Sequence, residues 1–334
     1  MRIHRKRFGA KMMIVGIAVL ALLLAVSVPS ARAAEKVSFR LSWLVQAIFS
    51  PFYMGLDKGF YKAEGIDLAI QEGRGSSLSA KLVAQKKDAF GISDAGVVIK
   101  SIEKGFPIKI FWLHYQQNPM AVLSIKGKGI RGPKDLIGKK VAGSARASFT
   151  ILFPSLLKRN GIDPSKVEVF NTNPPFHPLV LGGKVDAMLG YWMDNKPKLE
   201  EFGVEVEVVK YYDWGMNTLS NGLITHVDTL ANQPDLVRRF VRATARSWEY
   251  ARTHIKESID SLMPRMQKGK RSTQTKTLEN MMQILHTKNT QGKPLGWMSP
   301  KDWQDTVDNL YQTGLIKSKS PIGRYFTNDF VQGS

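Results

Sequence analysis

Two segments of the chain end in residues whose side chains can bind a small ligand. In residues 181–195 an apolar run leads into Tyr191, Trp192 and Asp194. Aromatic rings can stack on a planar molecule, and a carboxylate can accept hydrogen bonds from it. Residues 86–94 repeat the pattern, since Asp-Ala precedes a short apolar run that ends at Asp94. One such segment by itself fits a ligand site and an ordinary buried strand followed by a solvated loop equally well. Two of them predict two α/β lobes whose strand ends face one cleft.

Two turns rich in glycine and serine follow predicted strands and precede predicted helices. They span residues 73–77 and 143–148, and they contain Arg74, Ser76, Ser77, Ser144, Arg146 and Ser148. Backbone N–H groups and hydroxyls at such a turn can bond an anion or a carbonyl group. Ordinary helix capping explains either turn by itself. Because the two turns occupy equivalent places in the two lobes, we favour a single ligand that contacts both turns.

Catalytic and metal-binding patterns are missing from the sequence. His114, His177 and His226 are scattered and show no metal-ligand spacing. No nucleophile elbow or phosphate-binding loop is present. The chain has no cysteine, which excludes a thiol nucleophile and a cysteine-based metal site. We therefore predict a protein that is not an enzyme and that has no cofactor and no metal site.

The elements that position these segments alternate between strand and helix. Over residues 37–113, short apolar runs typical of strands alternate with segments whose apolar residues have helical spacing. The same alternation begins again over residues 140–191. This alternation is typical of a mostly parallel sheet covered by helices on both faces. An apolar run at residues 120–125 predicts a strand, and we place one crossing between the lobes near residues 124–129. A second crossing is predicted near residues 220–225.

The prediction is thus an α/β protein with two lobes and two hinge crossings. Its divisions are a leader at residues 1–33, a first lobe of residues 34–124 and 222–334, and a second lobe of residues 125–221. Within the second lobe, Pro154 predicts a late start or a kink in a helix over residues 148–160. Residues 236–251 carry an apolar helical stripe beside an arginine-rich face, which we interpret as solvated. The polar residues 267–275 are predicted to form a loop.

The N-terminus has the parts of a secretory leader. Five basic residues in the first 11 precede an apolar run at residues 12–28, Pro29, and the small residues around Arg32. The run is shorter than the roughly 20 residues that span a bilayer, which favours a cleaved signal over an uncleaved anchor. Without a cysteine to carry a lipid, the predicted product is a periplasmic protein that is neither lipidated nor embedded in the membrane.

The formal net charge of the chain is +20. Residues 1–33 contain six basic and no acidic residues, which leaves about +14 for the mature protein. The basic residues form no run of five or more, and no nucleic-acid-binding motif is visible. We therefore predict no nucleic-acid partner and a solvated basic surface that can favour anionic ligands.

Residues 50–70 resemble the opening of periplasmic substrate-binding proteins of ABC importers. The most similar branch is the thiamine-pyrimidine-synthase-like one, which includes binding proteins for pyrimidine precursors, alkanesulfonates, taurine and riboflavin. The residues that carry this resemblance are Trp43, Tyr53, Gly55, Gly59, Phe60, Tyr61, Glu64, Gly65, Ile66, Asp67 and Leu68. Looser matches follow at residues 75–77, 88–93 and 186–192, and the similarity covers residues 36–265. The resemblance implies the type II periplasmic-binding-protein fold, a ligand in the interlobe cleft, and a permease with its ATPase as partners. It also implies a monomer.

The same branch contains a pyrimidine synthase that uses its own histidine and a cysteine-rich motif. This chain has no cysteine, and Phe49 occupies the place of that histidine. Both differences favour a binding protein over an enzyme.

Two ligand classes remain open. Aromatic side chains suit a planar heterocycle such as a pyrimidine, with Asp194 as acceptor for a ring amino group. A sulfonate or other organic anion would instead use the two turns, with Arg74 or Arg146 as counter-charge. The candidate ligand-binding residues are Trp43, Gln46, Phe49, Ser76, Ser77, Asp94, Ser144, Arg146, Ser148, Tyr191, Trp192, Asp194 and Trp214.

Overall fold

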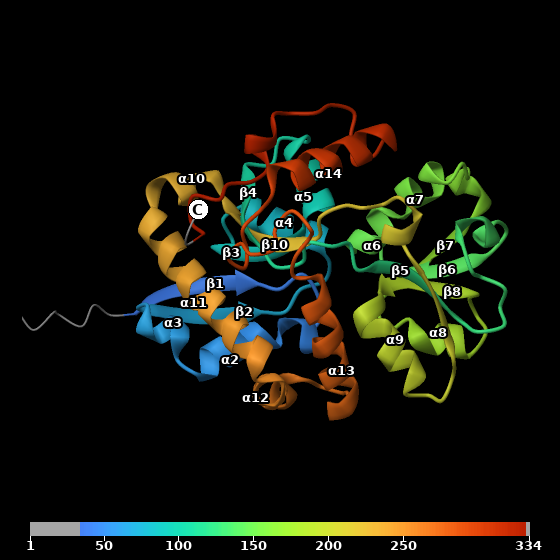
Figure 1. The fold of residues 1–334 in the computed structure, drawn as a ribbon, viewed down its shortest axis with the longest axis horizontal. Coiled ribbons are helices and arrows are strands. Elements are labelled where there is room, and N and C mark those ends of the chain that lie inside the picture. The colour runs from blue at the N-terminus through green and yellow to red at the C-terminus, as the bar shows by residue number, and fades with distance from the viewer. Residues whose placement is uncertain (1–33, 332–334) are drawn as a thin grey trace, which may run out of the picture. The chain divides into compact units, whose positions relative to one another are not determined.

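A computed structural model of the protein describes residues 34–331, and the predicted leader lies outside them. Two five-stranded sheets organise the chain (Figure 1). The first has the order β2-β1-β3-β10-β4, with β1 at Glu35–Arg40, β2 at Ile66–Gln71, β3 at Phe90–Asp94, β4 at Ile108–Leu113 and β10 at Asn221–His226. The second has the order β7-β6-β8-β5-β9, with β5 at Met120–Ile125, β6 at Lys140–Gly143, β7 at Glu168–Asn171, β8 at Ala187–Tyr191 and β9 at Val206–Lys210.

The two sheets are built on one plan. In the first, β1 runs parallel to β2 and β3, whereas β10 runs antiparallel to β3 and β4. In the second, β6 runs parallel to β7 and β8, whereas β5 runs antiparallel to β8 and β9. In each sheet the antiparallel strand is the one that follows a crossing from the other sheet. This plan confirms the predicted two-lobed α/β fold with mostly parallel sheets.

The first crossing lies earlier in the chain than predicted. Strand β5 pairs with β8 and β9, so it belongs to the second sheet and the chain crosses at residues 114–119. The apolar run of β5 fits this place, because a strand between two neighbours and under helices is buried on both sides. The second crossing spans residues 211–220 and also lies earlier than the predicted 220–225, because residues 221–226 form β10 of the first sheet. Asn118 Nδ2 ties the crossings together by donating to Thr218 Oγ1 at 2.8 Å.

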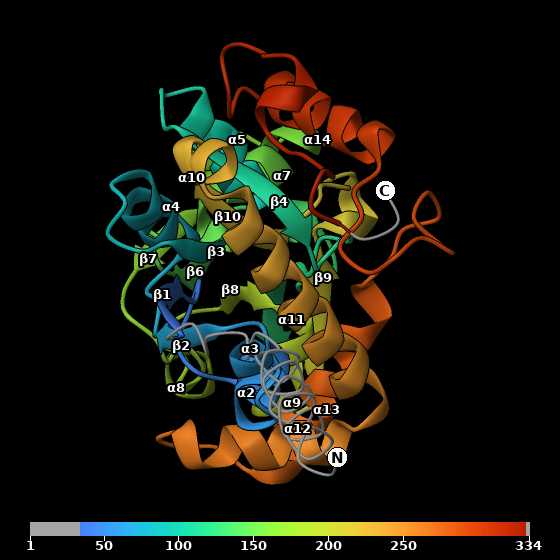
Figure 2. The same cartoon turned by 90° about the vertical axis from the view of Figure 1, so that its left-hand side faces the viewer.

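Helices cover both faces of the first sheet (Figure 2). One group contains α2 at Ser50–Asp57, α3 at Phe60–Ala63, α11 at Pro234–Thr253 and α12 at Ile255–Leu262. Another contains α4 at Ser76–Ala84, α5 at Ala95–Ile102, α10 at Val227–Asn232 and α14 at Pro300–Gln312. The apolar stripe of α11 is buried as predicted, and the ring of Phe240 stacks on Phe90 of β3 at 4.3 Å.

The arginine-rich face of α11 pairs with acidic residues of the same lobe. Arg239 contacts Glu35 at 2.8 Å, and Arg242 contacts Glu64 at 2.6 Å. These ion pairs bind the helix to the start of β1 and to the end of α3. Part of the basic charge that the composition shows is therefore already neutralised.

The second sheet is flanked by α6 at Ser148–Ile151, α7 at Phe153–Arg159, α8 at His177–Leu181 and α9 at Trp192–Glu200. The break between α6 and α7 confirms the interruption predicted at Pro154, which is the second residue of α7. Among residues 34–331, no helix is long and apolar enough to span a membrane.

Helix α13, at Arg271–Met281, overlaps a segment that we predicted as a loop. The prediction was wrong because α13 has no strong apolar stripe. Its buried side chains include the polar Thr273, Gln274 and Thr277. Helical structure here depends on packing against the rest of the protein, which local periodicity does not report.

Candidate functional site

A cavity of about 110 Å³ lies where side chains from the two lobes meet. The first lobe lines it with Ser42, Trp43, Gln46 and Ser76. The second lobe lines it with residues that include Ser148, Phe149, Phe176, Tyr191, Asp194 and Lys198. Trp43 and Phe149 meet across it edge to face, with ring centroids 5.7 Å apart. The cavity therefore has aromatic walls from both sides of the molecule.

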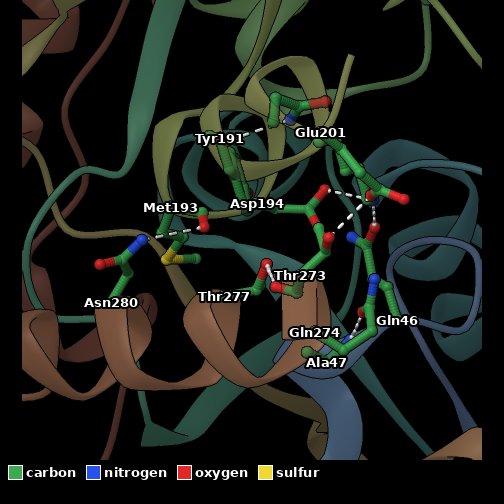
Figure 3. A network of polar contacts seen from close by, with 12 residues as sticks. Gln46, Ala47, Tyr191, Met193, Asp194, Glu201, Thr273, Gln274, Thr277 and Asn280 are labelled. Atoms are coloured by element: carbon green, nitrogen blue, oxygen red, sulfur yellow. Dashed lines mark hydrogen bonds and ion pairs between the residues drawn. The ribbon is translucent and has the colours of Figure 1, made fainter. Parts of the chain in front are cut away.

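One end of the cavity carries a charge pair between a partly buried lysine and a buried carboxylate. Lys198 Nζ donates to Asp194 Oδ2 and to Gln46 Oε1, both at 2.8 Å, and so joins the two lobes. Asp194 is 3 % exposed, and its Oδ1 atom has no hydrogen-bond partner. Figure 3 shows Asp194 and Gln46 close together at this end. Because a buried acceptor is costly to leave unpaired, Oδ1 is a candidate partner for an N–H or O–H group of a ligand.

The other end is formed by a hydrogen-bonded chain at the second crossing. Tyr191 Oη donates to Asn221 Oδ1 at 3.0 Å and lies 3.0 Å from Ser148 Oγ. Asn221 Nδ2 reaches Ser42 Oγ of the first lobe at 3.4 Å. This chain connects side chains of both lobes through Asn221, the first residue of β10.

A neutral imidazole also faces the cavity. Burial lowers the pKa of His177, and the nearby Lys198 ammonium lowers it further. His177 can therefore act near neutral pH as a hydrogen-bonding group without a positive charge.

A larger groove of about 570 Å³ adjoins the cavity and shares Trp43 and Pro174 with it. Arg74, Ser144 and Arg146 line this groove. Arg74 pairs with Glu72 at 3.3 Å. The groove combines hydroxyl and guanidinium donors, which are groups that bind anions.

Eight of the predicted residues line these two spaces. Trp43, Gln46, Ser76, Ser148, Tyr191 and Asp194 line the cavity, and Ser144 and Arg146 line the groove. The cavity thus brings together residues far apart in the chain, such as Gln46 and Lys198, which are 152 positions apart.

Three of the predicted aromatic residues do not line either space. Phe49 is fully buried in the core of the first lobe. Trp192 lies outside because neighbouring side chains at the end of a strand point to opposite sides, and its ring is covered by Lys210 Nζ at 4.5 Å. Trp214, in the 3-10 helix η4 at Tyr212–Trp214, is 40 % exposed and lies beside Gly132.

Asp94 and Ser77 also lie outside the cavity. Asp94 caps α5 by accepting from the N–H groups of Gly96 and Val97, and its Oδ2 accepts from Ser220 Oγ at 2.9 Å. Burial raises its pKa to about 7. Ser77 donates through Oγ to the carbonyl of Arg146 at 3.3 Å, so it joins the lobes instead of facing the cavity.

Sequence reasoning missed several cavity residues. Lys198 had a usable signal, because it lies four residues after Asp194 in a segment that follows a strand, where a helix would bring the two charges together. Phe149 and Phe176 had none, since each looks like an ordinary core residue in the sequence.

A family model described as "NMT1/THI5 like" matches residues 46–258. The chain belongs to this family. Among its relatives, the riboflavin-binding protein RibY of Chloroflexus aurantiacus is 26 % identical over 306 residues, which cover 90 % of this chain and 87 % of RibY. The 4-amino-5-hydroxymethyl-2-methylpyrimidine phosphate synthase of Schizosaccharomyces pombe is 23 % identical over 220 residues, 63 % of each protein.

Solved structures of similar fold include ligand-binding components of transporters. One is the ligand-binding component of an ABC-type import system from Staphylococcus aureus, with a TM-score of 0.68, 13 % identity, and coverage of 90 % of this chain and 99 % of that one. Another is the alkanesulfonate-binding protein SsuA from Xanthomonas axonopodis pv. citri bound to MOPS, with a TM-score of 0.69, 12 % identity, and coverage of 87 % and 98 %. The family member described here thus has the solute-binding-protein fold of ABC import systems.

The cavity gives two of the predicted tryptophans different expected roles. Trp43→Ala should weaken binding of a planar ligand by about 1–3 kcal/mol, because it removes an aromatic wall. Trp192→Ala should leave ligand affinity unchanged, since its ring lies outside the cavity under Lys210. Calorimetric titration of both variants checks this pair of expectations. Equal losses of affinity would place the ligand elsewhere.

Proposed function

We propose that this protein is an extracytoplasmic solute-binding protein that captures a small planar heterocycle and delivers it to an ABC permease and its ATPase. The observation that carries the proposal is the interlobe cavity with Trp43 on one side and Tyr191 and Asp194 on the other. A ligand that touches both lobes at once stabilises the closed form, which a transporter can distinguish from the empty one.

The size and polarity of the cavity support a ligand with a single ring. An apolar cavity of about 150 Å³ holds benzene, so about 110 Å³ suits one six-membered ring. Asp194 Oδ1 would accept a hydrogen bond from a ring amino group, and the aromatic walls would contact the ring faces. Substituents of the ring would extend into the adjoining groove. Relatives named for a pyrimidine phosphate and for riboflavin support a nitrogen heterocycle.

A second candidate ligand is a sulfonate or another organic anion. The groove with Ser144 and Arg146 favours it, and SsuA with bound MOPS has the same fold. Such a ligand would place its charge in the groove instead of beside Asp194.

Catalysis of pyrimidine synthesis is the alternative from another functional class. One relative is named as a pyrimidine phosphate synthase. Against this alternative, the chain has no cysteine, and Phe49 lies in the core instead of on the cavity. Formation of a pyrimidine by the purified protein would favour the enzyme.

A thermal-shift panel of single-ring heterocycles and sulfonates tests the proposed ligand class. A ligand at 100 times its dissociation constant should add about 2.7 kcal/mol of stability. We expect 4-amino-5-hydroxymethyl-2-methylpyrimidine to raise the melting temperature more than aliphatic sulfonates do. Stabilisation by sulfonates alone would favour the anion-binding alternative.

The substitution Asp194→Asn tests the contact that we assign between Asp194 and the amino group of the ligand. The variant should bind the aminopyrimidine about 1–3 kcal/mol more weakly, because a neutral amide replaces a charged acceptor. Wild type and variant should bind the analogue without the amino group equally. Calorimetry of the wild type and the variant, each with both compounds, measures the coupling free energy between Asp194 and the amino group. A coupling of zero would contradict the assigned contact.

Export is the remaining part of the proposal. Strand β1 begins at Glu35, so removal of residues 1–33 would leave every described strand intact. Protein from a secreting host should therefore begin at Ala34 or Glu35 when its intact mass is measured. Membrane-bound protein that retains residues 1–33 would show instead that the leader is an anchor.

A further inference from the structure

Helix α13 joins the two walls of the cavity although it does not line it. It lies beyond residues 46–258, which the family model matches. Figure 3 shows α13 running below α9, with side chains that reach toward Ala47 and toward α9. The contacts of α13 therefore bear on how the cavity is held together.

On the side of the first lobe, α13 holds the loop that carries Gln46. Gln274 Oε1 accepts a hydrogen bond from the N–H group of Ala47 at 2.9 Å. Gln274 is 1 % exposed and Ala47 is fully buried. Because water cannot replace this bond, loss of the acceptor would leave a buried N–H group unpaired.

On the side of the second lobe, α13 holds both ends of α9. Thr273 Oγ1 donates to Glu201 Oε2 at 2.7 Å, next to the C-terminal end of α9. Asn280 Nδ2 lies 3.4 Å from the carbonyl of Met193 in its first turn. Helix α9 carries Asp194 and Lys198, so its position sets the acceptor end of the cavity.

These contacts form a closed ring of interactions. The ring runs from Gln46 through Ala47 to Gln274 and Thr273, crosses to α9 at Glu201, and returns through Lys198 to Gln46. We propose that Gln274 and Thr273 are positioning residues for the interlobe cavity. They hold Gln46 of one lobe against Lys198 and Asp194 of the other, and they keep part of the closed arrangement in place before a ligand binds. The role in ligand binding rests on the function proposed above.

Two exposed ion pairs also join α13 to α9, and they provide the control. Lys270 lies 3.3 Å from Glu201, and Lys276 lies 3.4 Å from Glu200. Both lysines are more than half exposed, so their contribution to the closed arrangement is small. The buried bond of Gln274 and the partly buried bond of Thr273 are the ones expected to matter.

The test measures the distance between the lobes without any ligand. The chain has no cysteine, so Lys62→Cys and Lys166→Cys allow spin labels at two exposed sites, one on each lobe. Pulsed electron paramagnetic resonance then gives the distance distribution for the wild-type background and for each variant.

Four variants form two matched pairs. Gln274→Leu and Thr273→Val remove the hydrogen-bonding group, whereas Gln274→Glu and Thr273→Ser retain it. The first pair should lower the ratio of short-distance to long-distance populations about fivefold, the effect of one lost hydrogen bond. Thr273→Ser and the control Lys276→Met should match the wild-type background. Gln274→Glu should come closer to the background than Gln274→Leu does, since it keeps the acceptor but adds a buried carboxylate. Thr273→Val conserves volume, so it decides the test if Gln274→Leu fails to fold.

Coinciding distance distributions for Thr273→Val, Thr273→Ser and the background would overturn the proposal. A second readout is the preference for 4-amino-5-hydroxymethyl-2-methylpyrimidine over its analogue without the amino group. Thr273→Val should reduce this preference and Thr273→Ser should restore it. If neither compound binds the wild type, the proposed function fails, while the ligand-free distances still decide the role of α13.

Discussion

His114→Phe should make the protein more resistant to acid than the wild type. His114 lies fully buried among aromatic rings, and neither ring nitrogen has a hydrogen-bond partner. Burial lowers its pKa to about 3 from the usual 6.5. Between these values the unfolded chain binds a proton that the folded protein does not, so stability is lost as the pH falls. From pH 7 to pH 4 this loss is about 3 kcal/mol, and the variant should not show it.

Asp94→Asn should have the opposite effect. Burial raises the pKa of Asp94 to about 7 from the usual 3.8. Between these values the folded protein binds a proton that the unfolded chain does not, so this group adds stability as the pH falls from 7 to 4. The gain is also about 3 kcal/mol. The substituted side chain would still cap α5, because asparagine is as good an N-cap as aspartate.

In the wild-type protein the titrations of His114 and Asp94 therefore change the free energy of unfolding in opposite directions. Urea unfolding at pH 7 and pH 4 should reveal them, with each variant compared with itself so that changes in packing cancel. On going from pH 7 to pH 4, the free energy of unfolding of His114→Phe should change by about 3 kcal/mol in the stabilising direction relative to the wild type, and that of Asp94→Asn by about 3 kcal/mol in the destabilising direction. Changes equal to that of the wild type in both variants would contradict the origin assigned to both pKa shifts.

Gly75→Ala should increase the distance between the two lobes. Gly75 has a φ of 118°, and a Cβ atom added there would lie 2.4 Å from the carbonyl oxygen of Arg146 in the other lobe. Backbone strain alone would cost about 1–3 kcal/mol of stability. The backbone fixes the position of the new Cβ atom, and the atoms it meets first are backbone atoms of Arg146, so no side-chain rotation relieves the clash and we expect the lobes to separate. We expect the affinity for any ligand held between the lobes to fall at least tenfold, or about 1.4 kcal/mol.

Gly59→Ala is the matched control for this prediction. Gly59 also has a positive φ, 71°, and it also precedes a helix of the first lobe. No atom lies within 4 Å of the Cβ position there, so only the cost of the backbone conformation applies. With spin labels at positions 62 and 166, Gly75→Ala should shift toward longer distances and Gly59→Ala should not. If Gly75→Ala keeps the wild-type distances, the lobes do not approach at this point.

The sequence by itself determined the local elements and the kind of site. The burial of a helix face or a strand produces a regular spacing of apolar residues, which is why α11, β3 and β8 were predicted near their observed places. Strand ends with polar and aromatic residues indicated a site between two lobes, and Tyr191 and Asp194 do line the cavity. These features depend on neighbours a few residues away, so the sequence contains them.

Only the tertiary structure decided which segments meet. The apolar run of β5 suits either sheet, and its pairing with β8 and β9 moved the first crossing to residues 114–119. Tyr191 and Trp192 are equally aromatic, yet only Tyr191 faces the cavity. Helix α13 buries polar residues whose partners, Ala47 and Glu201, lie far away in the chain. Contacts of this kind are set by packing between distant segments, and local spacing does not record them.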